Sequence, residues 1–119
     1  MQNILSRLGA IIGIQPISSE IPVQFSLSQN YPNPFNPTTK IRFSIPLSRG
    51  VTAEGSRGVL VNLTIYDVMG RVVETLHNGE LKPGTYEADW NASNFPSGVY
   101  FYRLSASDYT ETKKMVLIK

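Results

Sequence analysis

The stretch TKIRFSI, residues 39–45, alternates polar and apolar side chains without a break. Successive side chains of a β-strand point to opposite faces of the sheet, so this alternation predicts a strand with one buried and one solvated face. The expected buried face consists of Ile41, Phe43 and Ile45, opposite Lys40, Arg42 and Ser44. Pro46 ends the strand because proline has no N–H to donate to a neighbouring strand.

The same period recurs on both sides of this stretch. Within residues 59–68, for example, Val61, Leu63 and Ile65 alternate with polar neighbours, and within residues 85–90 the inward set is Tyr86, Ala88 and Trp90. Short strands repeated every 8 to 12 residues or so are typical of a sandwich. We therefore predict an all-β, immunoglobulin-like antiparallel β-sandwich of about seven strands. The expected strands are residues 25–28, 39–45, 59–68, 71–77, 85–90, 99–106 and 109–118.

Turn-forming residues separate these strands. Asp67 and Gly70 occupy the first and last positions of a type I turn, in which the Asp67 side chain caps the backbone. Asn78–Gly79 predicts a further turn, with His77 exposed beside it. Additional turns are expected at residues 82–84, 95–98 and 107–108.

Composition limits the classes of protein that fit. The chain has 119 residues, the length of one domain, and its Lys and Arg residues are scattered, with a net charge of +2. A nucleic-acid-binding protein needs a concentrated basic surface, so no nucleic-acid partner is expected. The absence of cysteine removes disulfides, thiol catalysis and zinc–thiolate sites.

The first 24 residues have a different character from the rest. Residues 8–14 form an apolar run that is too short to span a bilayer, so we expect no transmembrane segment. As a signal peptide the run is weak, because one basic residue precedes it and no small-x-small cleavage site follows. We interpret residues 1–24 as a linker or the tail of an upstream protein, with a signal-like segment as the alternative, and residues 25–119 as the domain.

No set of residues suited to catalysis emerges from the sequence. His77 is the single histidine, and no glycine-flanked serine elbow accompanies it. The carboxylates occur singly, at turns or strand edges. We therefore predict no catalytic, cofactor-binding or metal-binding residues, no cofactor, and no enzymatic activity.

Two segments have sequence features that a structural scaffold alone would not require. Residues 29–38 hold three prolines alternating with Asn and aromatic residues, which predicts a stiff extended ribbon that Tyr31 and Phe35 pin to the end of the sandwich. Residues 113–119 are apolar on both faces between cations, which is unusual at a chain end and fits at least a last strand buried between neighbours. Tyr100 follows Gly98 in the Gly-x-Tyr pattern of a tyrosine corner, or else is an ordinary strand residue.

Several ordered blocks together carry a family resemblance. They are LSQNYPNPFNPTTKIRF (27–43), YDVMGR (66–71), PGTY (83–86), WNA (90–92), SGVYFYRL (97–104) and the ending from Lys113 to Lys119. Over residues 25–119 the chain resembles the type A C-terminal sorting domain of the type IX secretion system. It is also similar to the immunoglobulin-like domain of the flagellar hook-capping protein. One departure is the longer connection at residues 48–58, which a surface loop tolerates.

The resemblance implies a function in export. A covalently linked upstream passenger would cross the outer membrane of a Bacteroidetes-like bacterium, passing through the periplasm to the cell surface or the medium. The implied partners are an outer-membrane translocon and a sortase-type peptidase that cuts in the linker before Phe25. The alternative is a structural or adhesive immunoglobulin-like module. In either case we expect binding through exposed strand edges.

The resemblance also assigns residues to this function. Expected translocon contacts are Gly98, Val99, Tyr100, Lys113, Lys114, Met115, Val116, Leu117, Ile118 and Lys119. The family-signature loop comprises Tyr31, Pro32, Asn33, Pro34, Phe35, Asn36 and Pro37.

Overall fold

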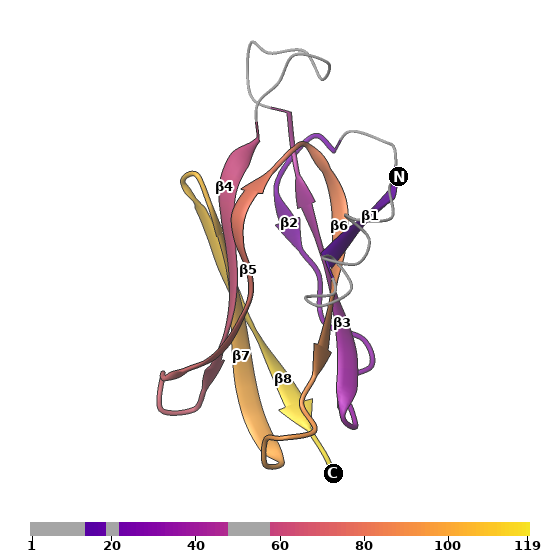
Figure 1. The fold of residues 1–119 in the computed structure, drawn as a ribbon, viewed down its shortest axis with the longest axis vertical. Coiled ribbons are helices and arrows are strands. Elements are labelled where there is room, and N and C mark those ends of the chain that lie inside the picture. Colours follow the sequence, from indigo (N-terminus) through magenta and orange to yellow (C-terminus); the bar gives the residue numbers. More distant parts are fainter. Residues whose placement is uncertain (1–13, 19–21, 48–57) are drawn as a thin grey trace.

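Two antiparallel four-stranded sheets face one another in the computed structural model, which describes residues 14–18, 22–47 and 58–119 (Figure 1). Sheet A has the strand order β1-β6-β3-β2 and sheet B the order β5-β4-β7-β8. The described residues thus form a sandwich, which confirms the predicted fold class, with eight strands instead of about seven. Their bounds are β1 (Ile14–Ser18), β2 (Ser26–Leu27), β3 (Thr38–Ile45), β4 (Val59–Asp67), β5 (Val72–Leu81), β6 (Gly84–Asn91), β7 (Gly98–Ala106) and β8 (Tyr109–Leu117).

Strand β3 behaves as its alternation predicts. Ile41, Phe43 and Ile45 are completely buried, and each faces an inward residue or glycine of β6. Phe43 pairs with Tyr86, and their rings stack with centroids 5.7 Å apart. The two central strands of sheet A therefore contribute one continuous apolar layer to the core.

An aromatic cluster closes one end of the core. The Trp90 ring lies 5.8 Å from Phe35, 5.7 Å from Phe95 and 5.6 Å from Tyr100, measured between centroids. Its indole N–H donates to Glu74 Oε1 at 2.8 Å, which satisfies the one polar group that burial of the ring leaves. Phe35, Glu74 of β5 and the nearby residues Phe95 and Tyr100 thus meet at Trp90.

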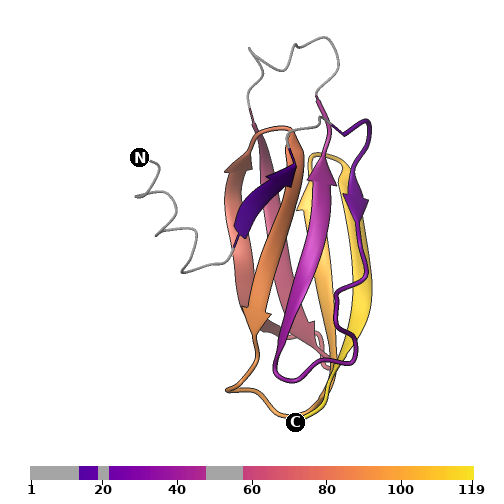
Figure 2. The ribbon, with the colours of Figure 1, turned by 90° about the vertical axis from the view of Figure 1, so that its right-hand side faces the viewer.

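Strand β1 lies within the segment interpreted as a linker. It pairs with β6 from Ile14 opposite Ala88 to Ser18 opposite Thr85 and forms one edge of sheet A (Figure 2). Ile14 also packs against the core. The domain boundary at residue 25 stays a prediction. Most of the apolar run at residues 8–14 and nearly all of the long connection at 48–58 lie outside the described residues.

The prediction of a turn at Asn78–Gly79 is wrong. Both residues lie inside β5, opposite Asn62 and Val61 of β4, and the chain reverses at residues 82–83 instead. Strand β4 is nine residues long and apolar on its inner face, so it needs a partner along its whole length. The turn at Lys82–Pro83 allows that pairing, whereas a turn at Asn78 would leave Val59 without a neighbouring strand and Val61 with β7 as its neighbour on one side alone.

The position of His77 follows from the same correction. It is half-buried within β5, not exposed at a turn, and its ring Nε2 lies 3.3 Å from the Gly79 carbonyl oxygen. Two register shifts between β4 and β5 interrupt the strict alternation of β5, so that both Leu76 and His77 are shielded. Burial lowers the pKa of His77 from its ordinary value, since the charged ring would lose solvation.

The turn between β4 and β5 forms as predicted. The Gly70 N–H donates to the Asp67 carbonyl at 3.0 Å, and the Asp67 carboxylate accepts from the backbone N–H groups of Met69 and Arg71. Arg71 Nε adds an ion pair at 2.9 Å. The hydrogen bond from the Arg71 backbone is the main reason that the pKa of Asp67 is lowered. Gly70 completes the turn with φ of +83°, which is unfavourable for other residues.

We expect G70A to lower the free energy of unfolding by about 1 kcal/mol, because an alanine Cβ is strained at this φ. G79A is the matched control. A Cβ at Gly79 meets only the His77 ring at 3.7 Å, ordinary contact distance within an extended strand. Urea denaturation measures both variants. Equal destabilisation by the two would show that Asn78–Gly79 is a left-handed turn after all.

The free energy of unfolding should fall as the pH drops below about 6.5, the ordinary pKa of histidine. The folded chain holds His77 at a lowered pKa, so in this window the unfolded chain binds more protons and gains stability relative to the folded one. H77Q should flatten the pH dependence between about pH 7 and the folded-state pKa, because the chain has 1 histidine. Parallel curves for H77Q and the wild type would contradict the assignment.

Candidate functional site

Three connections and the C-terminus gather at one end of the sandwich, the lower end in Figure 1. The connections are residues 29–37, here called the proline ribbon, residues 67–71 between β4 and β5, and residues 92–97 between β6 and β7. We call this region the tail end. Most of the sequence blocks that carry the family resemblance reach it.

The proline ribbon is bound to the outer edge of β8. The Phe35 N–H donates to the Val116 carbonyl and the Ile118 N–H donates to the Phe35 carbonyl, both at 2.9 Å. The Phe35 side chain, 2% exposed, turns inward onto Trp90. Phe35 thus fills the end of the core while its backbone extends sheet B, and the prediction that it pins the ribbon is confirmed.

Polar side chains of the ribbon bind the same edge. Asn33 Oδ1 accepts from the Val116 N–H at 3.0 Å, and Gln29 Nε2 donates to the Lys114 carbonyl at 2.7 Å. Strand β8 is an edge strand of sheet B, so its outer neighbour is this ribbon instead of the strand expected from the sequence. From the Lys114 carbonyl to the Ile118 N–H, these four hydrogen bonds cover the edge where a partner strand would otherwise add.

Tyr31 does not pin the ribbon, contrary to the prediction. Its side chain is 79% exposed, and only its backbone is held, through two hydrogen bonds with Lys40. Asn30 takes the expected role. Its buried side chain donates to Thr39 Oγ1 at 3.0 Å and to the Pro32 carbonyl at 3.1 Å. Sequence reasoning missed this residue because a lone asparagine among turn residues gives no sign of burial.

Two tyrosines of β7 fix the connections at this end. The Tyr100 hydroxyl donates to the Pro96 carbonyl at 2.7 Å, which confirms the tyrosine corner. The Tyr102 hydroxyl donates to the Ser28 carbonyl at 2.7 Å and accepts from the Asn30 N–H at 2.8 Å. Burial raises the pKa of Tyr102 far above its ordinary value. Tyr102 therefore ties sheet B to the start of the ribbon, a role that its sequence position did not reveal.

The residues expected to contact a translocon do lie together. Gly98, Val99 and Tyr100 pair with Leu117, Val116 and Met115 across the β7–β8 ladder. Their exposure differs along the strand, however, because alternate side chains enter the core. Met115, Leu117 and Tyr100 are buried, Val99, Val116 and Lys113 are half-buried, and Gly98, Lys114, Ile118 and Lys119 are exposed. The tail thus buries only one of its two apolar faces.

Lys119 holds the C-terminus in place. Its ammonium donates to the carbonyls of Ser93 and Phe95, at 2.6 and 3.0 Å, and its N–H donates to Ser97 Oγ at 2.9 Å. Lys113 instead pairs with Glu111 on its own strand, at 3.3 Å. The terminal cation therefore binds the β6–β7 connection instead of fraying into solvent.

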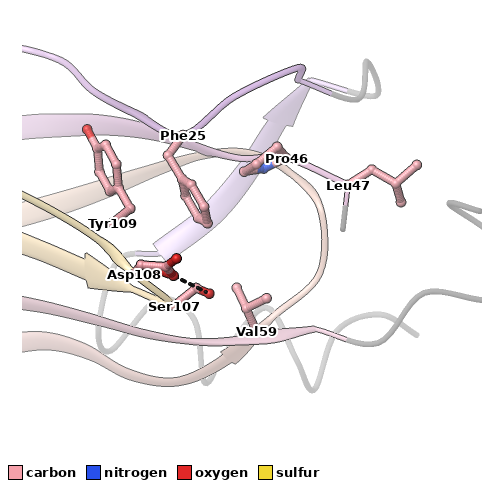
Figure 3. Close-up of a pocket in the computed structure, with 7 residues that line it drawn as sticks. All are labelled: Phe25, Pro46, Leu47, Val59, Ser107, Asp108 and Tyr109. Carbon is pink, nitrogen blue, oxygen red and sulfur yellow. Dashed lines mark hydrogen bonds between the residues drawn. The ribbon is translucent and has the colours of Figure 1, made fainter. Parts of the chain in front are cut away.

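Among the described residues, open hollows lie at both ends of the sandwich. One, of about 540 Å³, lies at the tail end between the β4–β5 turn and the start of β7, where Met69, Phe95 and Pro96 are among its lining residues. The other, of about 620 Å³, lies at the opposite end (Figure 3), where Phe25 stacks on Tyr109. There Ser107 Oγ donates to Asp108 at 3.2 Å, but the lining residues include no imidazole to act as a base.

The described residues hold neither a grouped set of metal ligands nor a membrane-spanning helix. Within residues 14–18, 22–47 and 58–119, no three side chains of His, Cys, Asp or Glu are grouped as a metal site. That same part of the chain has no helix long and apolar enough to cross a membrane. At the tail end, hydrogen bonds within the domain hold the ribbon, β8 and the C-terminus in one arrangement.

The described residues thus form a small β-sandwich whose last strand is clamped by a proline ribbon. The family model described as the secretion system C-terminal sorting domain matches residues 29–119, from the start of the ribbon to the terminal lysine. The chain therefore belongs to this family, whose members are C-terminal sorting signals for type IX secretion, so it is part of a protein exported through the outer membrane. The family is not one of enzymes. No curated protein matches the chain.

Replacing Phe35 by alanine should lower the free energy of unfolding by about 3 to 5 kcal/mol, since it empties the end of the core. It should also speed hydrogen exchange at the Ile118 and Val116 amides, which the ribbon protects. Y31A is the control, because Tyr31 is exposed and should cost less than about 0.5 kcal/mol. A larger loss of unfolding free energy in Y31A than in F35A would refute the role of Phe35 in holding the ribbon.

Proposed function

We propose that this chain directs a covalently linked upstream passenger through the type IX translocon, for release or attachment at the cell surface. The observation that carries the proposal is the span of the family match, which covers the ribbon, β7 and the tail that meet at one end of the sandwich. A translocon that reads this end would read a folded surface, because the tail is bonded to three other segments.

The placement of β1 supports a passenger on the N-terminal side. Strand β1 forms the outer edge of sheet A, whereas β2, at the other edge of that sheet, leads into the ribbon that binds β8. Figure 2 shows β1 on one side of the sandwich and β2 with β8 on the other. A bulky passenger joined before β1 would leave the tail end accessible.

We assign translocon contact within the predicted set to Gly98, Lys114, Ile118 and Lys119, which are exposed, together with the half-buried Val99, Lys113 and Val116. The buried members Tyr100, Met115 and Leu117 would act by maintaining the strand geometry. This division follows from the alternation of β7 and β8. It replaces a continuous recognition tail by the side chains that the core leaves exposed or half-buried.

We also propose that a sortase-type peptidase cuts in the connection between β1 and β2. Val23 in this connection is 93% exposed, as a protease site requires. Cleavage there would leave β1 on the passenger side, still paired with β6 through the backbone. Release of the passenger would then require β1 to separate from β6.

The test is a fusion of a periplasmically exported fluorescent reporter to the N-terminus of the full chain, in a host with a type IX system. We expect the reporter at the cell surface or in the medium, and its retention in the periplasm when the translocon is deleted. The matched control carries an unrelated β-sandwich of similar size in place of this chain. Periplasmic retention of the full-chain fusion at the level of this control would refute the proposal and favour a structural or adhesive module.

A further inference from the structure

The outer faces of the two sheets differ in charge. On sheet A, Lys40 pairs with Asp89 at 2.8 Å and Arg42 pairs with Glu87 at 3.3 Å. These cross-strand ion pairs balance the charges of that face. Such a face is well suited to contact with water. Its charged side chains already pair with one another, and these pairs bury no apolar surface.

The outer face of sheet B is different near the tail end. Residues directly opposite in an antiparallel ladder share one face of the sheet, so Phe101 lies between Tyr66 of β4 and Lys114 of β8. Val99 and Val116 form the next pair toward the tail end. All four apolar side chains are only half-buried, which leaves an aromatic and aliphatic surface across three strands.

Two cations border this surface. Arg103 lies over the Tyr66 ring, 4.9 Å from its centroid, and donates to the Tyr66 hydroxyl at 2.6 Å. Lys114 stands opposite Phe101 on the other side. The outward positions of β4, β7 and β8 alternate with the buried ones and include no Asp or Glu. On β5 the exposed Glu80 stands opposite the exposed Leu60, at the other end of the sheet. Near the tail end the face therefore combines exposed apolar area with positive charge that no carboxylate of β4, β7 or β8 balances.

The face suits part of a protein interface. Its residues span three strands about 4.8 Å apart and, along β7, the five residues from Val99 to Arg103, or roughly 16 Å, so they cover about 230 Å² of the 800 Å² or so that one partner buries in a stable complex. A membrane is a poorer fit, because electrostatic lipid binding uses clusters of about four to eight cations. Here there are two cations, Arg103 and Lys114, and the two aromatic side chains are half-buried.

We propose that the outer face of sheet B, formed by Tyr66, Val99, Phe101, Arg103, Lys114 and Val116, docks a protein of the export machinery that presents carboxylates beside apolar side chains. The proposal rests on the proposed function, to which it adds the face used and the chemistry of the partner. Carboxylates would pair with Arg103 and Lys114, while apolar groups would cover Phe101 and its neighbours.

The test compares R103Q/K114Q with the matched variant K40Q/R42Q, each in the full-chain reporter fusion. Both remove two exposed cations, but from opposite faces. We expect R103Q/K114Q to lower the exported fraction about tenfold and K40Q/R42Q to change it less than about twofold, since surface ion pairs contribute little to folding. Circular dichroism and thermal unfolding of the purified chains check that both variants fold. A second variant, F101T, keeps a strand-forming residue and should reduce export as well.

The outcomes separate this proposal from the one before it. If the wild-type fusion is exported and R103Q/K114Q and F101T match it, the docking face is refuted while the sorting function stands. If the wild-type fusion stays in the periplasm, both proposals fail. Binding of the wild-type chain to vesicles of equal parts phosphatidylglycerol and phosphatidylcholine, lost in R103Q/K114Q, would overturn the protein partner in favour of a lipid surface.

Discussion

The contact between Phe35 and the end of the core holds the rest of the tail end together. The ring fills the space beside Trp90, and the backbone of the same residue makes two hydrogen bonds to β8. A single residue thereby fills the end of the core with its ring and closes the outer edge of β8 with its backbone. Without it, the C-terminal strand would have β7 as its one neighbour, and chain ends held on one side tend to fray.

Edge closure changes how a partner can approach the tail. Strand addition needs free N–H and C=O groups, and the ribbon occupies these groups of β8 between Lys114 and Ile118. The remaining accessible features are side chains: the exposed members of the tail and the apolar face of sheet B. Recognition of a side-chain surface requires a folded domain, which agrees with how many interactions hold this end in one shape.

The outer face of sheet A suits contact with water, whereas the outer face of sheet B is the one proposed for binding. Sheet A balances its outward charges in cross-strand pairs, while sheet B presents half-buried aromatic and aliphatic side chains beside Arg103 and Lys114. In the proposed function, the passenger joins on the side marked by β1, at the far edge of sheet A. Attachment and binding would then use separate parts of a small domain, so a large passenger need not block the proposed binding face.

The sequence by itself determined the strands, the fold class and much of the site. Alternation at residues 39–45 and 59–68, and the Asp67 turn, depend on side-chain period and local hydrogen bonds, which neighbouring residues specify. The same local reasoning placed Phe35 inside and Tyr100 at its corner. The sorting family was indicated by a set of sequence motifs in a fixed order, and not by physical reasoning about single residues.

Tertiary structure decided the features that depend on which segments meet. Asn78–Gly79 is a good turn locally, but β4 needed a partner along its length, and pairing outweighed the local preference. Asn30 takes the role expected of Tyr31, because Thr39 of β3 and Tyr102 of the other sheet provide polar partners for it. Strand β1 depends in the same way on the free edge of β6. Local sequence carries no information on such contacts, since their energy resides in groups far apart along the chain.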